Sequence, residues 1–102
     1  MATTANKPLV CKLTTPELRR RRATVIADLK SLVLARGERN DGYSYRFEGT
    51  NANLDRLTEF IKTERVCCDF FTFQLTVDET SALLEISGPP GAKEFLDKEV
   101  GL

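Results

Sequence analysis

The sequence predicts an α+β fold, a two-layer sandwich in which a mostly antiparallel sheet carries helices on one face. Several segments alternate apolar and polar residues with the two-residue period of a strand that buries one face. Other segments repeat apolar residues at helical spacing, so that each long helix has one apolar stripe. We expect the order β-α-β-α-β-β-α in a single domain, residues 1–102, with the polar residues 1–7 disordered. The order of the strands within the sheet stays open.

The first half of the chain is expected to contain a strand, a helix and a second strand. Residues 8–14 alternate and suggest a short strand. A threonine cap followed by Pro16 begins a helix. The stripe of that helix reaches Arg36, and Gly37 follows as its C-cap. Residues 43–49 alternate again, which predicts a strand with one buried face.

The second half of the chain adds a helix, a hairpin and a closing helix. Apolar residues recur at helical spacing over residues 50–68. Alternation returns in residues 70–77, and after a turn residues 82–87 form the second strand of a hairpin. A Gly-Pro-Pro-Gly turn then leads into a short helix over residues 92–102.

Composition narrows the functional classes. The 102 residues include 15 Lys plus Arg and 15 Asp plus Glu, a balance that argues against a dedicated binder of nucleic acid or of an acidic membrane. No stretch approaches the ~18 apolar residues that a membrane span needs, so we expect a cytoplasmic protein. A reducing compartment would keep the three cysteines as thiols. Histidine is absent, which removes the usual general base and favours binding over catalysis.

Two adjacent cysteines form the most distinctive chemical feature. Cys68 falls in the apolar stripe of the second helix and Cys67 at its margin. Glu64 lies between them, three and four residues earlier, so the three side chains can meet over one turn. Cys11, in the first predicted strand, is expected to point into the same core.

The carboxylate of Glu64 lies so close to the apolar stripe that it needs a partner. Two arginines are candidates: Arg22, which falls within the stripe of the first helix, and Arg65. A pair between Arg22 and Glu64 would either satisfy both charges or line a small polar binding pocket.

Three chemical interpretations of the cysteine pair compete. A redox or nucleophilic role is disfavoured, because the end of a helix and a neighbouring carboxylate both oppose a thiolate. A site for a thiophilic metal or metalloid ion would use Cys67 and Cys68, with Glu64 and Cys11 nearby. Mercury-, copper(I)- and arsenite-like species are the candidate ions. Packing is the third interpretation, because free cysteine behaves as a small buried hydrophobe.

Residues 64–75, ERVCCDFFTFQL, and residues 84–96 resemble a family of small bacterial proteins of uncharacterised activity. The family pattern is E-R-x-C-C-P-F-x-x-F-x-L followed by a glycine-rich turn and K-x-F-L. Its upstream D-G-Y-x-x-R-F strand matches residues 41–47, and Asp69 replaces the usual proline. Some relatives look associated with heavy-metal resistance regulators. The resemblance therefore implies thiol–metal chemistry at Glu64 and the cysteine pair.

Aromatic residues suggest two further sites. Tyr43 and Tyr45 share a strand face and either line a pocket for a small ligand of unknown identity or belong to the core. Phe70 should point away from Phe71 and Phe73, because alternate residues of a strand face opposite sides. An aromatic side chain on the helix-free face would be exposed unless a second chain covers it, so we expect a homodimer.

Overall fold

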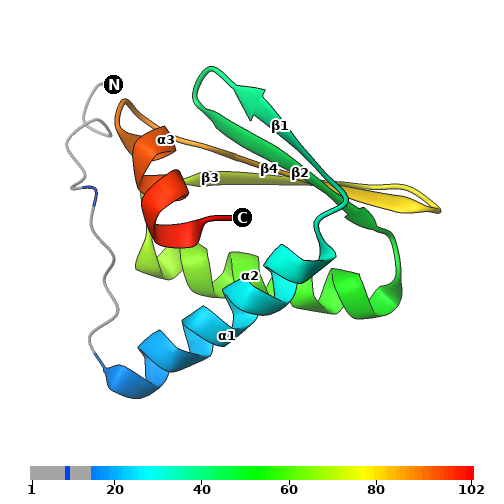
Figure 1. The fold of residues 1–102 in the computed structure, drawn as a ribbon, viewed down its shortest axis with the longest axis horizontal. Coiled ribbons are helices and arrows are strands. Elements are labelled where there is room, and N and C mark those ends of the chain that lie inside the picture. Colours follow the sequence, from blue (N-terminus) through cyan, green and yellow to red (C-terminus); the bar gives the residue numbers. More distant parts are fainter. Residues whose placement is uncertain (1–8, 10–14) are drawn as a thin grey trace.

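The computed structural model describes Leu9 and residues 15–102 and confirms the two-layer α+β architecture. A four-stranded antiparallel sheet forms one layer, and the helices lie against one of its faces (Figure 1). The helices are α1 (Pro16–Leu32), α2 (Asn51–Cys67), α3 (Ala92–Phe95) and a π-helical segment η2 (Leu96–Val100). The strands are β1 (Ala35–Arg39), β2 (Gly42–Glu48), β3 (Thr72–Val77) and β4 (Ser81–Ser87). Within the described residues, no helix has the length and apolar character needed to cross a membrane.

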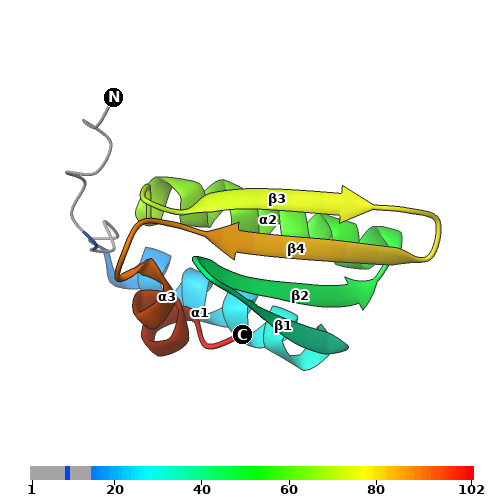
Figure 2. The same cartoon turned by 90° about the horizontal axis from the view of Figure 1, so that it is seen from above.

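The sheet has the order β1-β2-β4-β3, and every neighbouring pair is antiparallel (Figure 2). Two hairpins, β1–β2 and β3–β4, therefore lie side by side. Because β4 is antiparallel to both β2 and β3, these two strands run parallel, with α2 as the connection between them. The arrangement is a split β-α-β unit, and it fixes α2 against the inner face of the sheet.

The end of the first helix was predicted wrongly. The helix ends at Leu32, and the residues from Ala35 to Arg39 form strand β1 instead of a last helical turn. The backbone of β1 pairs with β2, with Arg36 opposite Tyr45, and so covers an edge of β2 that would otherwise lack a partner. Helical spacing of apolar residues is a local signal, so it gives no information about this long-range pairing between β1 and β2. The strand expected over residues 8–14, like the disorder expected over residues 1–7, lies outside the described residues.

Threonine side chains cap both long helices. The Thr15 hydroxyl accepts a hydrogen bond from the backbone N–H of Leu18 at 3.3 Å. At α2 the Thr50 hydroxyl accepts from the N–H of Asn53 at 3.1 Å. The buried Asn53 amide also donates to the carbonyl of Glu48 at 2.9 Å. These contacts fix the point at which the chain leaves β2 and enters α2.

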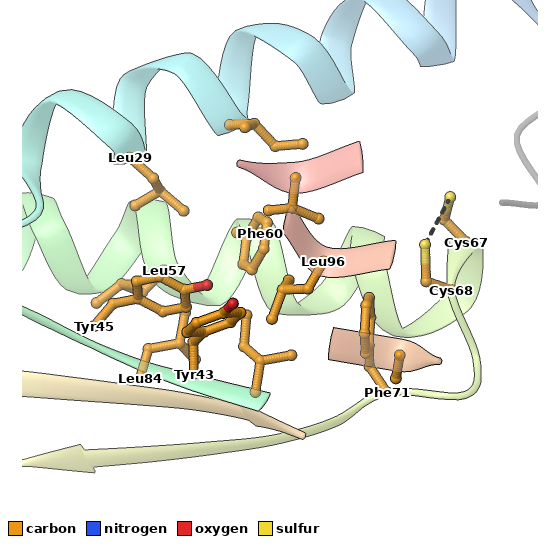
Figure 3. Packing of buried hydrophobic residues seen from close by; sticks show 14 of the residues in the cluster. Leu29, Tyr43, Tyr45, Leu57, Phe60, Cys67, Cys68, Phe71, Leu84 and Leu96 are labelled. Atoms are coloured by element: carbon orange, nitrogen blue, oxygen red, sulfur yellow. Dashed lines mark hydrogen bonds between the residues drawn. The ribbon is translucent and has the colours of Figure 1, made fainter. Parts of the chain in front are cut away.

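The core lies between the inner face of the sheet and the helix layer, in which α1 and α2 lie side by side (Figures 2 and 3). Its largest fully buried apolar side chains are Tyr45, Phe47, Leu84 and Ile86 from the sheet, Leu29, Leu57 and Phe60 from the long helices, and Leu96 from η2. The alternation of β2 and β4 is confirmed by their burial, because every second residue is buried.

Phe70 was expected on the helix-free face of the sheet, and that expectation is wrong. Its side chain is only 6% exposed. The ring packs on Phe71, with a centroid distance of 4.6 Å, and edge-on against Phe95 at 5.0 Å. Because β3 begins at Thr72, Phe70 lies in the preceding turn, where strand alternation does not apply. The homodimer stays a prediction, but Phe70 no longer supports it.

Candidate functional site

The last turn of α2 brings together Glu64, Cys67 and Cys68, as helical spacing predicted. The Cys68 thiol donates to the Glu64 carboxylate, with 3.8 Å between Sγ and Oε1. The two sulfur atoms are 3.7 Å apart, and a dashed line marks this contact in Figure 3. Cys68 itself is the C-cap, and its backbone N–H donates to the Glu64 carbonyl.

Arg22 of α1 is the partner of Glu64. Its Nε donates to Oε2 at 2.6 Å and its Nη2 donates to Oε1 at 3.0 Å, so the pair is bidentate. The Glu64 side chain is 1% exposed and that of Arg22 is 13% exposed. The contact expected from the two apolar stripes is therefore present, whereas the other candidate, Arg65, lies exposed on α2. A charged carboxylate is tolerated here because a guanidinium satisfies both of its oxygens.

The local electrostatics favour the neutral thiol of Cys68. Burial raises the pKa of Cys68 to about 12, and the negative charge of Glu64 acts in the same direction. Arg22 opposes both effects but does not outweigh them. For Arg22, burial opposes the charge, but the hydrogen bond and the attraction of Glu64 prevail and raise its pKa. Cys68 is thus a weak nucleophile at neutral pH, in agreement with the argument from the helix end.

Cys67 differs from the prediction in two respects. Its side chain is 1% exposed and not marginal. The helical pattern of α2 alone does not reveal what covers this flank of the helix. Cys67 is also disulfide-bonded, whereas Cys68 is a free thiol. The expectation of three thiols is therefore wrong for this state. The remaining cysteine, Cys11, lies outside the described residues.

The donor set for a metal ion is small. Among residues 15–102 no group of three His, Cys, Asp or Glu side chains is arranged to hold an ion. Both oxygens of Glu64 already accept hydrogen bonds from Arg22. Within the described chain, Cys67 and Cys68 are thus the two sulfur donors that can act together, and only once Cys67 is reduced.

Tyr43 and Tyr45 both belong to the core. Tyr45 is 1% exposed, and burial raises its pKa to about 12. The Tyr43 hydroxyl donates to Asp97 at 2.7 Å, and the guanidinium of Arg36 lies 4.0 Å from the centre of its ring. These contacts link β1, β2 and η2. A ligand-binding role for the two tyrosines stays a prediction.

Sequence reasoning did not identify a surface hollow of about 420 Å³. The hollow lies beside the first residues of β2, at the end of that strand that is remote from the start of α2. It lies between the β1–β2 turn and the turn formed by residues 88–91, and Asp41, Lys93 and Glu94 contribute its charges. The one feature of the sequence that marks this hollow is the Gly-Pro-Pro-Gly motif, which we interpreted only as a rigid turn. The side chains of the hollow carry charges of both signs and do not include the cysteine pair.

Comparison with protein-family models, with curated proteins and with solved structures finds no match for this chain. The resemblance of the Glu-Arg-x-Cys-Cys region to a family of small bacterial proteins therefore stays a prediction. The function has to be argued from the geometry of the site.

Proposed function

We propose that this domain, in its reduced form, binds a thiophilic metal or metalloid ion through Cys67 and Cys68. The observation that carries the proposal is the separation of 3.7 Å between the two sulfur atoms on adjacent residues. Two thiolates at that distance can bind one ion without a rearrangement of the helix end. Arg22, hydrogen-bonded to Glu64, supplies positive charge beside the thiolates that would form.

The sulfur separation favours one class of ion. With metal–sulfur bonds of about 2.3 Å, sulfur atoms 3.7 Å apart subtend an angle of about 107° at the ion. A linear two-coordinate ion would need about 4.6 Å between the same atoms. The geometry therefore suits a pyramidal or tetrahedral species such as arsenite better than linear mercury(II) or copper(I). A third donor would come from solvent, from a second thiol compound or from Cys11.

The disulfide of Cys67 gives the proposed function a redox requirement. A dithiol reductant converts the disulfide into two thiols and is itself oxidised to a disulfide. The incoming ion then displaces the protons of Cys67 and Cys68, which it can do despite the raised pKa of Cys68. A reducing cytoplasm, the location that we propose, would maintain the receptive state.

A structural module is the second candidate function, and burial favours it. Both sulfur atoms are almost completely buried, and Arg22 satisfies Glu64 fully. In that case the cysteines fill the space at the end of α2 and bind no ion. The two candidates differ in one measurable property, the affinity of the reduced protein for arsenite.

Calorimetric titration of arsenite into the protein, with and without prior reduction, tests the proposal. We expect the reduced protein to bind one equivalent and the oxidised protein to bind none. Cys67→Ser and Cys68→Ser should each abolish binding, whereas Cys11→Ser, as the matched control, should retain at least weak binding. Urea unfolding establishes that each variant is folded. Binding of equal affinity by the Cys67→Ser/Cys68→Ser double variant, or no binding by the reduced native chain, would refute the proposal.

A further inference from the structure

The two edges of the sheet differ in charge. On edge strand β1, Arg36, Glu38 and Arg39 are charged, and each forms an ion pair. Their partners are Asp97, Lys93 and Glu85, respectively. Charged side chains on an edge oppose pairing with another chain, because a new strand would have to displace or desolvate them. The β1 edge is thus protected.

The opposite edge, β3, has none of these protective features. Its six residues, Thr72–Val77 (TFQLTV), include no charged residue, no proline and no glycine. Within the described chain β3 pairs with β4 alone, so one row of its backbone N–H and C=O groups has no strand partner. Threonine, valine and phenylalanine are residues that favour strands. This edge is a template for one more strand.

Apolar side chains beside the β3 edge are incompletely covered. Phe73 and Leu75, on the inner face of β3, are only partly buried, and Val77 is 46% exposed. Leu54 and Ile61 of α2 are also partly buried, and helical geometry places both on the flank of α2 that faces away from α1. A strand and helix added at this edge would remove these apolar surfaces from water.

We propose that the β3 edge is a homodimer interface, formed by antiparallel pairing with the same strand of a second copy. A two-fold axis perpendicular to the sheet keeps both helix layers on one face. Residues that lie opposite each other in the two strands must then point to the same side of the sheet, and the two-fold axis passes between a residue and its own copy. For the two central residues of β3, this places Gln74 opposite the partner's Gln74 or Leu75 opposite the partner's Leu75. The result is a continuous eight-stranded sheet with the apolar residues of both copies on its inner face.

The distribution of charge favours a second copy as the occupant. An edge without charge opposes no like charges when it pairs with itself, and it offers no attraction to a strongly charged partner. Self-pairing also ends at the dimer, because the two strands left at the outer edges are copies of the charged β1. The interface is therefore isologous and closed.

Sedimentation velocity on the full chain, over a hundredfold range of concentration, tests the interface. We expect a species of twice the chain mass for the native protein. Gln74→Lys, an exposed position on β3, should weaken dimerisation by more than about tenfold, because in either register the two new positive charges lie on one face, directly opposite or diagonal to each other. Ala35→Lys is the matched control, since Ala35 is also exposed but lies on β1, and it should leave the dimer unchanged. Circular dichroism establishes that both variants are folded.

Hydrogen exchange of the β3 amides supplies a second readout. In the dimer, the amides on the free side of β3 should exchange more slowly as the concentration rises. A native chain that sediments as a monomer throughout the range would overturn the proposal, as would a dimer that Gln74→Lys leaves intact. Slow exchange that is independent of concentration in a monomer would also overturn it, because that result indicates pairing with a segment of the same chain.

Discussion

The carboxylate of Glu64 is only 1% exposed inside the helix layer, and its partner Arg22 explains why a charged group can be buried there. Removal of a carboxylate from water costs several kcal/mol, and a bidentate guanidinium recovers most of that loss. Arg22 and Glu64 belong to different helices, so their pairing also sets how α1 lies against α2. Burial raises the pKa of the neighbouring Cys68, and the same carboxylate adds to that effect. One ion pair thus contributes to the packing and to the chemistry of the site.

Arg22→Ala should lower the free energy of unfolding by about 3–5 kcal/mol, because it leaves the buried carboxylate of Glu64 without a partner. Arg21→Ala is the control on the adjacent residue. It removes an exposed ion pair with Glu59, at 2.8 Å, and should cost no more than about 1 kcal/mol. Urea unfolding measures both. Equal losses for the two variants would show that the buried pair has no special weight.

The elements depend on close backbone contacts at particular points of the sheet. Gly42 begins β2, and a side chain there would meet the facing strand β4: a Cβ atom would lie 1.8 Å from the carbonyl oxygen of Ile86. Gly37 in β1 is different, because its Cβ would meet only the hydroxyl of Ser44, at 2.6 Å, and that side chain can rotate. The two glycines lie in neighbouring strands but have different structural constraints.

Gly42→Ala should therefore separate β2 from β4 locally and lower the free energy of unfolding by more than about 3 kcal/mol, beyond the usual range for a single substitution. Gly37→Ala should cost about 1 kcal/mol or less. Thermal and urea unfolding of the two variants supply the comparison. If Gly37→Ala proves the more damaging change, the close approach at Gly42 does not limit the packing of the sheet.

At the scale of the whole molecule, two buried acids link folding to pH. The pKa of Cys68 rises from 9.0 to about 12 and that of Tyr45 from 10.0 to about 12, both mainly because of burial. The folded chain therefore retains these protons up to about pH 12. The unfolded chain releases them near pH 9 and 10. Since the unfolded state binds fewer protons in this window, the free energy of unfolding must fall as the pH rises.

We expect the stability to be independent of these two groups below pH 9 and to decline progressively between pH 9 and 12. Urea midpoints measured from neutral to alkaline pH give the slope. Cys68→Ala with Tyr45→Phe removes both titrating groups and should reduce the slope. An unchanged slope in the double variant would mean that other groups cause the alkaline loss.

Particular residues show how far sequence reasoning reached at the site. The contact between Arg22 and Glu64 was predictable, because each charge interrupts an apolar stripe and two such stripes must face each other. The positions of Glu64 and Cys68 followed from helical spacing within a single turn. The burial of Cys67 did not follow, because the apolar stripe of α2 placed this residue only at its margin, and neither did its disulfide. Phe70 was misplaced because alternation predicts direction only where a strand has begun.

The sequence by itself determined the class of the fold, the bounds of α2 and the burial pattern of β2 and β4. These features depend on periodicity and capping, which involve only residues that are close together in the sequence. The tertiary structure alone decided the strand order, the formation of β1 by residues 35–39, and the contrast between a charged and an uncharged sheet edge. Each of these depends on which distant backbone satisfies a strand's hydrogen bonds, and side-chain periodicity carries no information about that partner.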